Sequence, residues 1–218
     1  MNAKILLTAA AIVALSLALL AGAIAVADPP KDASSAGAKP ELKLPPGWTE
    51  EDFKAYIQAA TPGKMHEFLA QEVGEWHGKN TMWMGPGAEP MQTECTSTVK
   101  PLMDGRFTQC EMAGEAPGMG PYRGLAIYGF DNITQKFVST WIDNMSTSFA
   151  TGEGELSADG KTLTWTYHCN CPLQKKPIVL RQVETITGPG TKTLEMFGPE
   201  PKSGKEYKMM RIELTKKD

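Results

Sequence analysis

The residues best placed to do chemistry in this chain lie between Leu125 and Thr147. Two runs of strand-forming residues flank a turn at Asp131-Asn132 there, and Trp141 and Asp143 stand two positions apart on the second run. Side chains at that spacing on a strand face the same side, so both would point into the lumen of a barrel. Ligand pockets are built from such aromatic walls with one polar contact. The alternative is that Trp141 is plain core and Asp143 caps the following loop.

Arg106 follows the turn residues Asp104-Gly105 and would lie at the rim of the same barrel. A guanidinium binds a carboxylate through two parallel hydrogen bonds, which makes Arg106 a candidate contact for an anion. The alternative is a structural ion pair with Asp104 or Glu111. A hypothesis of a small enzyme uses the same groups, with Asp143 or His66 as acid or base and Arg106 steadying an anion.

Metal binding is the other chemistry that the residue types suggest. His168-Cys169-Asn170-Cys171 would supply a histidine and two thiolates for zinc or copper, but the second half of a ligand set is missing. His66 and His77 are far from this segment in sequence. The 12 methionines, Met82 and Met84 among them, form no repeated copper motif and are better explained as adaptable core or pocket lining. We therefore expect no metal and no cofactor.

No catalytic motif accompanies these residues. The sequence has no Gly-x-Ser-x-Gly, no His-Glu-x-x-His and no glycine-rich phosphate loop before a helix. Its 22 Lys+Arg against 25 Asp+Glu give no basic excess of the kind that nucleic-acid binders show. An enzyme is therefore unsupported by motif, and nucleic acid is not an expected partner.

The N-terminal sequence predicts export. After Lys4, an uncharged apolar run ends in Ala25-Val26-Ala27, the small-x-small pattern of a signal peptidase site. We expect a signal peptide over 1–27, a secreted or periplasmic protein, and no membrane partner once the peptide is removed. An uncleaved anchor is the alternative, because the run is long enough to span a bilayer. Residues 28–47, rich in Pro, Ala, Ser, Gly and Lys, predict a disordered leader.

Cysteines in an exported chain suggest disulfides. The four are Cys95, Cys110, Cys169 and Cys171. If Asp104-Gly105 are the turn residues of a hairpin, Cys95 lies opposite Gly114 and misses Cys110 by four positions. Cys169 and Cys171 could close only a small, strained ring. Pairing between the two groups and free thiols both stay open.

The remaining sequence predicts one domain over 48–218, with helices first and strands after. Thr49 and Asp52 have the spacing of a helix cap, which opens a helix to about Ala60. Thr61-Pro62 predicts a second helix start, and that helix would end at Gly74. Beyond it, runs rich in Thr, Val, Ile and aromatics alternate with turn residues. They predict ten strands, near 75–84, 91–100, 105–113, 121–130, 135–143, 147–157, 161–169, 177–187, 191–197 and 205–215.

Ten sequential strands with short turns favour an all-β fold, an antiparallel up-and-down barrel, because closure removes unpaired strand edges. A two-sheet sandwich is the competing architecture. Turns such as Asp104-Gly105 and Asp159-Gly160 join neighbouring strands, which favours the barrel. Between 161 and 168 the sequence alternates, so Trp165 and Tyr167 share one face and threonines the other. The short helices would lie across or beside one barrel end.

Two features resemble the signature of lipocalins and other calycins. Gly74-Glu75-Trp76 follows a short helix and opens the first strand, and Arg211 lies on the last strand. In that signature the tryptophan closes the barrel end beneath a basic side chain of the final strand, a cation–π contact. The resemblance implies structural roles for Trp76 and Arg211. Some calycins bind haem through one histidine, and His168 would be the candidate here.

More narrowly, five motifs resemble a bacterial calycin-like family known as domain of unknown function 1579. In order they are His66-Glu67-Phe68-Leu69, Gly74-Glu75-Trp76, Asp104-Gly105-Arg106-Phe107, Gly129-Phe130-Asp131-Asn132 and Thr140-Trp141-Ile142-Asp143. The resemblance covers roughly Met65 to the C-terminus. Phe130 stands where the family has a tyrosine, which keeps the ring and drops a hydroxyl. The family has no established activity, so the resemblance implies a calycin-like fold and no chemistry.

The sequence as a whole therefore favours an exported calycin-like barrel that binds a small apolar or amphipathic ligand without transforming it. The expected ligand-binding residues are Trp83, Trp141, Asp143, Trp165 and Tyr167, with Arg106 at the rim. The alternatives are the small enzyme described above, a haem- or metal-binding barrel through His168, and a barrel filled solidly by its own side chains. The sequence leaves the oligomeric state open.

Overall fold

The computed structural model describes residues 44–217. The predicted signal peptide and most of the predicted leader lie outside the described residues. Within residues 44–217, no helix is long and apolar enough to cross a bilayer.

The first helix of the described chain, α2 (Glu50–Ala60), is capped as the sequence predicts. The N–H of Asp52 donates to Thr49 Oγ1 at 3.1 Å, and the N–H of Thr49 donates to Asp52 Oδ2 at 2.8 Å. This reciprocal capping box satisfies two donors that the first helical turn would otherwise leave unpaired. The Thr49 N–H and the Thr49 hydroxyl, which donates to Asp52 Oδ2 at 2.7 Å, lower the pKa of the Asp52 carboxyl because both donors favour its charged form.

The second helix, α3 (Lys64–Ala70), begins later than predicted. Its N-cap is Gly63, so Pro62 lies outside the helix. The reason is His66, whose Nδ1 accepts a hydrogen bond from Gly63 N–H at 3.0 Å. His66 is buried and meets the ring of Phe130 edge-on at 5.9 Å. Its ring nitrogen therefore has a structural partner at the helix start.

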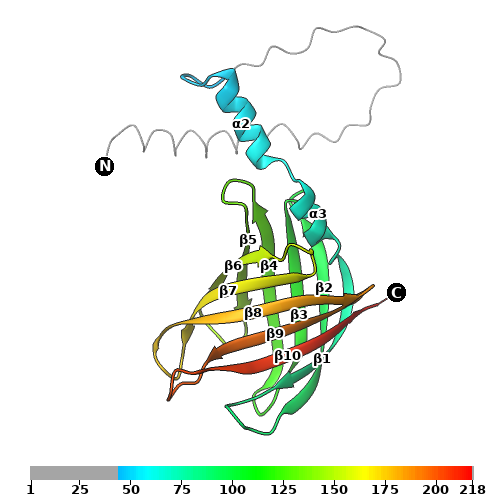
Figure 1. Cartoon of the computed structure of the whole chain (residues 1–218), viewed down its shortest axis with the longest axis vertical. Coiled ribbons are helices and arrows are strands. Elements are labelled where there is room, and N and C mark those ends of the chain that lie inside the picture. The colour runs from blue at the N-terminus through cyan, green and yellow to red at the C-terminus, as the bar shows by residue number, and fades with distance from the viewer. Residues whose placement is uncertain (1–43, 218) are drawn as a thin grey trace. The chain divides into compact units, whose positions relative to one another are not determined.

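Ten strands follow, and each pairs antiparallel with the next. They are β1 (Gly74–Met82), β2 (Met91–Leu102), β3 (Phe107–Ala116), β4 (Gly120–Asp131), β5 (Lys136–Asp143), β6 (Ala150–Leu156), β7 (Thr162–Cys171), β8 (Lys176–Gly188), β9 (Thr191–Pro199) and β10 (Glu206–Lys216). β1 also pairs with β10, which closes the barrel (Figure 1). The predicted up-and-down barrel is confirmed, and the sandwich is wrong.

One end of the barrel, here called the helical end, carries the two helices. Asn132, in the turn between β4 and β5, donates from Nδ2 to the carbonyl oxygens of Ala59 at 2.9 Å and Thr61 at 2.8 Å. Arg106, in the turn between β2 and β3, donates from Nε to Ala60 O at 3.1 Å. Figure 1 shows α3 against this end. Two hairpin turns therefore hold the chain between α2 and α3.

The opposite end, here called the open end, is formed by the loops after β1, β3, β5, β7 and β9. The first four of these loops each expose a large apolar side chain: Met84, Met119, Phe149 and Leu173.

The helical half of the barrel is packed with side chains. Leu69 of α3 joins Phe137, Leu163, Trp165 and Tyr167 in one buried cluster. Phe130 packs edge-on against Phe137 with ring centroids 5.0 Å apart.

The register of the β2–β3 hairpin matches the prediction. Cys95 lies opposite Gly114, and Cys110 lies opposite Val99. The turn runs through left-handed backbone, with φ of 55° at Asp104 and 81° at Gly105, the second of which a glycine accommodates without steric cost. All four cysteines are unpaired in the structure.

Candidate functional site

A cavity of about 480 Å³ occupies the barrel interior and reaches the loops of the open end. Pockets for small molecules and cofactors commonly have volumes of about 300–1,000 Å³. The alternative of a barrel filled solidly by its own side chains is therefore wrong.

Sulfur-containing side chains make up much of the cavity wall. Eight of the 12 methionines line it, namely Met82, Met84, Met91, Met112, Met119, Met145, Met196 and Met210. Three of the four cysteines, Cys95, Cys110 and Cys169, do so as well. Methionine is unbranched and polarizable, so such a wall adapts to ligands of irregular outline. Within the described part of the chain, no three His, Cys, Asp or Glu residues are grouped so as to hold a metal ion.

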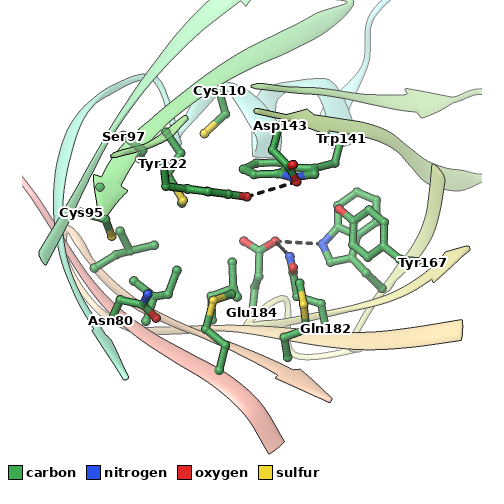
Figure 2. Close-up of a pocket in the computed structure, with 18 of the residues that line it drawn as sticks. Asn80, Cys95, Ser97, Cys110, Tyr122, Trp141, Asp143, Tyr167, Gln182 and Glu184 are labelled. Carbon is green, nitrogen blue, oxygen red and sulfur yellow. Dashed lines mark hydrogen bonds between the residues drawn. The ribbon is translucent and has the colours of Figure 1, made fainter. Parts of the chain in front are cut away.

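A cluster of Tyr122, Trp141 and Asp143 lines the cavity near the open end (Figure 2). Asp143 Oδ2 accepts hydrogen bonds from Trp141 Nε1 at 3.0 Å and from the Tyr122 hydroxyl at 3.4 Å. The two rings stack with centroids 6.5 Å apart and planes 19° from parallel. Asp143 Oδ1 also accepts from Met145 N–H at 2.9 Å, so the carboxylate caps the loop as well as facing the lumen. We call these three residues the mouth cluster.

The backbone of β4 positions the tryptophan of the mouth cluster. Gly124 pairs with Asp143 on β5, and Trp141 lies so close over Gly124 that a Cβ there would be 2.1 Å from the ring. Only glycine permits this approach. Burial, together with the nearby Asp143 charge, raises the pKa of Tyr122 well above its ordinary value. The Tyr122 hydroxyl therefore stays protonated and acts as a donor.

A second polar group, here called the floor cluster, lies toward the helical end. Lys192 Nζ contacts Glu184 Oε2 at 3.2 Å and also donates to Glu72, which follows α3. Glu184 Oε1 accepts from Trp165 Nε1 at 3.0 Å and from Gln182 Nε2 at 2.9 Å. Figure 2 shows Glu184 and Gln182 on the wall that faces the mouth cluster.

The floor cluster keeps its lysine charged despite burial. The Lys192 side chain is only 14% exposed. Burial by itself would lower the pKa of Lys192, but the carboxylates of Glu184 and Glu72 outweigh it and raise that pKa above the ordinary value. The single ammonium is thus shared between two carboxylates.

A third polar contact runs along the barrel wall, from β7 over Gly152 of β6 to β5. The Tyr167 hydroxyl donates to Ser139 Oγ at 3.1 Å, and Tyr167 stacks on Trp165 with centroids 5.8 Å apart. On another wall, Asn80 Oδ1 is buried and has no hydrogen-bond partner among the described residues. That oxygen is an acceptor which an N–H or O–H group of a ligand would satisfy.

The closure of the helical end needs one correction. Trp76 is covered by Lys192 of β9, 5.2 Å from its ring centroid, and by Lys216 of β10, 5.6 Å away. Arg211 is therefore not the basic partner that the resemblance implied. Arg211 lies between Met210 and Ile212 of β10, which both face the lumen, so its own side chain points outward. On the outer face its guanidinium forms ion pairs with Glu195 and Glu213.

Of the predicted ligand-binding residues, four line the cavity and two do not. Trp141, Asp143, Trp165 and Tyr167 are in the wall. Trp83 is outside it, because inward positions on β1 are even-numbered, as at Asn80 and Met82. Arg106 is also outside, since it bonds Ala60 O and approaches Asp104 at 3.7 Å. The predicted structural alternative, an ion pair with Asp104, is what the structure has.

The haem alternative through His168 and the pairing of Asp143 with Arg106 do not match the geometry. His168 is exposed and alternates with the inward-facing Tyr167 and Cys169, so it points away from the lumen and cannot reach a haem there. Asp143 ends β5 at the open end, about 25 Å of strand from the helical end that holds Arg106 and His66. An acid or base at Asp143 working with Arg106 is therefore ruled out.

Sequence reasoning missed Tyr122 of the mouth cluster and the charged residues of the floor cluster. Tyr122 had a signal, because Tyr122, Gly124, Ala126 and Tyr128 alternate with other residues along one face of β4. Glu184 and Lys192 are eight residues apart in the β8–β9 hairpin, so strand pairing is a signal for that pair. Glu72 had no signal, since it is 120 residues from Lys192 in sequence.

Comparison with known proteins identifies the family and the fold. The solved structures that match include an S-type phycobiliprotein lyase, CPES, from Guillardia theta, and Rv2717c from M. tuberculosis. The first has a TM-score of 0.50 and 8% identity over 75% of this chain and 97% of its own. The second has a TM-score of 0.55 and 11% identity over 72% of this chain and 100% of its own. At these identities the likeness concerns the fold.

No curated protein matches the chain. The model of the family described as protein of unknown function (DUF1579) matches residues 61–216, from the connection before α3 to the end of β10. The match includes both the mouth cluster and the floor cluster, and the chain belongs to the DUF1579 family.

Proposed function

We propose that this protein binds a small apolar or amphipathic ligand inside the barrel and does not transform it. The observation that carries the proposal is the cavity of about 480 Å³, whose wall combines thioether, aliphatic and aromatic side chains with a few converging polar groups. Binding sites for small molecules have this composition, because apolar contact supplies affinity and isolated polar groups fix orientation. Burying each methylene of a ligand contributes about 0.8 kcal/mol.

The polar groups of the cavity support binding better than catalysis. Asp143 accepts three hydrogen bonds from the protein, and Glu184 is held by Trp165, Gln182 and Lys192. A general acid or base must exchange a proton with its substrate. Carboxylates that are already satisfied by fixed donors are better suited to orienting a ligand. The fold that the protein shares with a phycobiliprotein lyase is compatible with a ligand in the barrel.

The experiment that tests the proposal blocks the lumen from one strand. Ser97 is buried and lines the cavity, whereas its neighbour Thr96 is exposed on the outer face of β2. Ser97→Phe places a ring inside the barrel, and Thr96→Phe adds the same ring outside. The neutral fluorophore N-phenyl-1-naphthylamine brightens in apolar surroundings and serves as the probe.

We expect the wild type and Thr96→Phe to bind the probe with similar affinity. The affinity of Ser97→Phe for the probe should be lower by at least about tenfold, which corresponds to 1.4 kcal/mol of binding free energy. Thermal melts of both variants establish that they fold. Equal binding by both variants, or no binding by the wild type, would overturn the proposal.

Export is also a proposal, supported by the Ala25-Val26-Ala27 ending of the apolar run. Native mass spectrometry of protein purified from its own cells tests both proposals together. It reports the mass of any bound ligand and the first residue of the mature chain.

A further inference from the structure

The charged groups around the cavity are mostly acidic. Three acidic side chains face the lumen, those of Glu72, Asp143 and Glu184, against the lysines Lys161 and Lys192 of its lining, whereas Glu94 and Glu115 are exposed at outward positions of β2 and β3. A cleft lined by one sign of charge with apolar walls raises the local concentration of ions of the opposite sign. The cavity is therefore built to attract cations.

Neither lysine is available to an anion at the mouth. Lys192 is shared between Glu184 and Glu72 in the floor cluster. Lys161 is exposed and directly precedes β7 at the helical end, whereas the mouth cluster lies at the open end. An anionic head group inside the mouth would meet the carboxylate of Asp143 without a neutralising partner.

Asp143 carries a charge that no described residue neutralises. Its partners are the Trp141 indole N–H, the Tyr122 hydroxyl and the Met145 backbone N–H, all of them neutral donors. None of the ion pairs between described residues includes Asp143. Figure 2 shows its carboxylate beside the stacked rings of Tyr122 and Trp141, facing the lumen.

A carboxylate next to two aromatic faces is the combination that recognises an ammonium group. The faces of tyrosine and tryptophan carry negative quadrupole potential and attract a cation within about 6 Å, and quaternary ammonium ligands are commonly bound in this way. The carboxylate adds Coulomb attraction at close range.

We propose that the ligand is a cationic amphiphile whose ammonium head lies against Asp143, Tyr122 and Trp141 and whose apolar tail runs along the methionine-lined lumen toward Trp165. The inference rests on the proposed function and deepens it by naming the ligand class. It also predicts discrimination, because a fatty acid of the same chain length would place its carboxylate beside Asp143.

The test compares two amphiphiles that share a tail. Dodecyltrimethylammonium and dodecanoate, each below its micelle concentration and at equal ionic strength, compete with bound N-phenyl-1-naphthylamine. We expect the cation to displace the probe at a concentration at least about tenfold lower than the anion, the combined effect of one ion pair and two ring contacts.

Variants of the mouth cluster locate the head group. Asp143→Asn keeps an acceptor for Met145 and removes the charge, so the preference for the cation should fall by up to about fivefold while binding of the neutral probe is retained. Glu111→Gln, on the exposed face of β3, is the matched control and should leave the preference unchanged. If Asp143→Asn does not fold, Tyr122→Leu removes one ring and should weaken only the cation.

The outcomes separate the two proposals. Equal displacement by both amphiphiles, or a preference for dodecanoate, overturns the ligand class while binding of the neutral probe upholds the proposed function. An unchanged preference in both Asp143→Asn and Tyr122→Leu overturns the placement of the head group. Failure of the probe and both amphiphiles to bind the wild type overturns the proposed function and the inference with it.

Discussion

Replacing Lys192 by methionine tests whether the floor cluster holds the helical end together. The substitution keeps most of the apolar stem and removes the ammonium that Glu72 and Glu184 share. It also removes the cation 5.2 Å from the centroid of the Trp76 ring. Two carboxylates then lie at the base of the barrel without a counter-charge.

The magnitude follows from burial. The three side chains are 14%, 22% and 15% exposed, so solvent screens the interaction little. Removing one partner of a buried pair costs about 3–5 kcal/mol, because the remaining charge stays buried and unpaired. For a domain of this size, 1 kcal/mol shifts Tm by about 2–4 °C. We therefore expect Lys192→Met to lower Tm by roughly 6–20 °C.

The assay is thermal unfolding followed by far-ultraviolet circular dichroism, with Lys208→Met as the control. Lys208 pairs with Glu195 on the outer face, where the lysine side chain is 37% exposed and Arg211 remains as a second partner. An exposed pair contributes about 0–1 kcal/mol, so the control should lose less than about 4 °C.

The pH dependence gives a second readout. The pKa of Lys192 is higher in the folded protein than in the unfolded chain. The stabilisation that its ammonium gives the folded state is therefore fully present below about pH 10, the ordinary range for lysine. It is lost only when the pH rises through the pKa of Lys192 in the folded protein. The deficit of Lys192→Met should be constant between pH 6 and pH 9, a window chosen from that range. A deficit no larger than that of Lys208→Met at pH 7 would refute the reasoning.

Three further predictions concern the thiols, the helices and the N-terminus. Burial raises the pKa of the Cys110 thiol to about 11, so about one thousandth of the thiol is ionised at pH 8. Iodoacetamide should therefore label Cys110 far more slowly in the folded protein than in the urea-unfolded chain, and equal labelling rates would contradict this. Asn132→Ala removes two hydrogen bonds to the α2–α3 connection, each contributing about 1 kcal/mol, so hydrogen exchange should quicken in α2 and stay unchanged in β7. Intact mass of the exported protein should correspond to a chain that begins at Asp28; retention of residues 1–27 would favour the anchor.

The strands could be predicted from sequence because the positions of the turn residues agree with the alternation of apolar and polar residues. Turn residues such as Asp104-Gly105 mark the hairpin ends, and alternation on β7 places Trp165 and Tyr167 inward. The start of α3 could not be predicted as well. Thr61-Pro62 has the composition of a helix start, but the His66 ring accepts the Gly63 N–H and selects a start closer to the barrel.

The mouth cluster could be predicted in part from the sequence, whereas the contact between Glu72 and Lys192 in the floor cluster could not. Trp141 and Asp143 are two positions apart, so strand periodicity alone pairs them. Glu72 and Lys192 are 120 residues apart and meet only when α3 packs onto the closed barrel. Arg211 shows a signal that was overlooked: Ile212 and Leu214 face inward, so the same alternation places Arg211 outside and Lys216 toward Trp76.

The two ends of this barrel use charge in opposite ways, and that difference suggests how a ligand would be oriented. At the floor, each buried charge has a protein partner, so a ligand gains little by bringing another charge there and would have to break the pairs of Lys192. At the mouth, Asp143 is satisfied by neutral donors only and keeps its full charge toward the lumen. An amphiphile would therefore enter with its apolar tail first and leave its charged head at the open end. The exposed Met84, Met119 and Phe149 of that end offer apolar contact along the way.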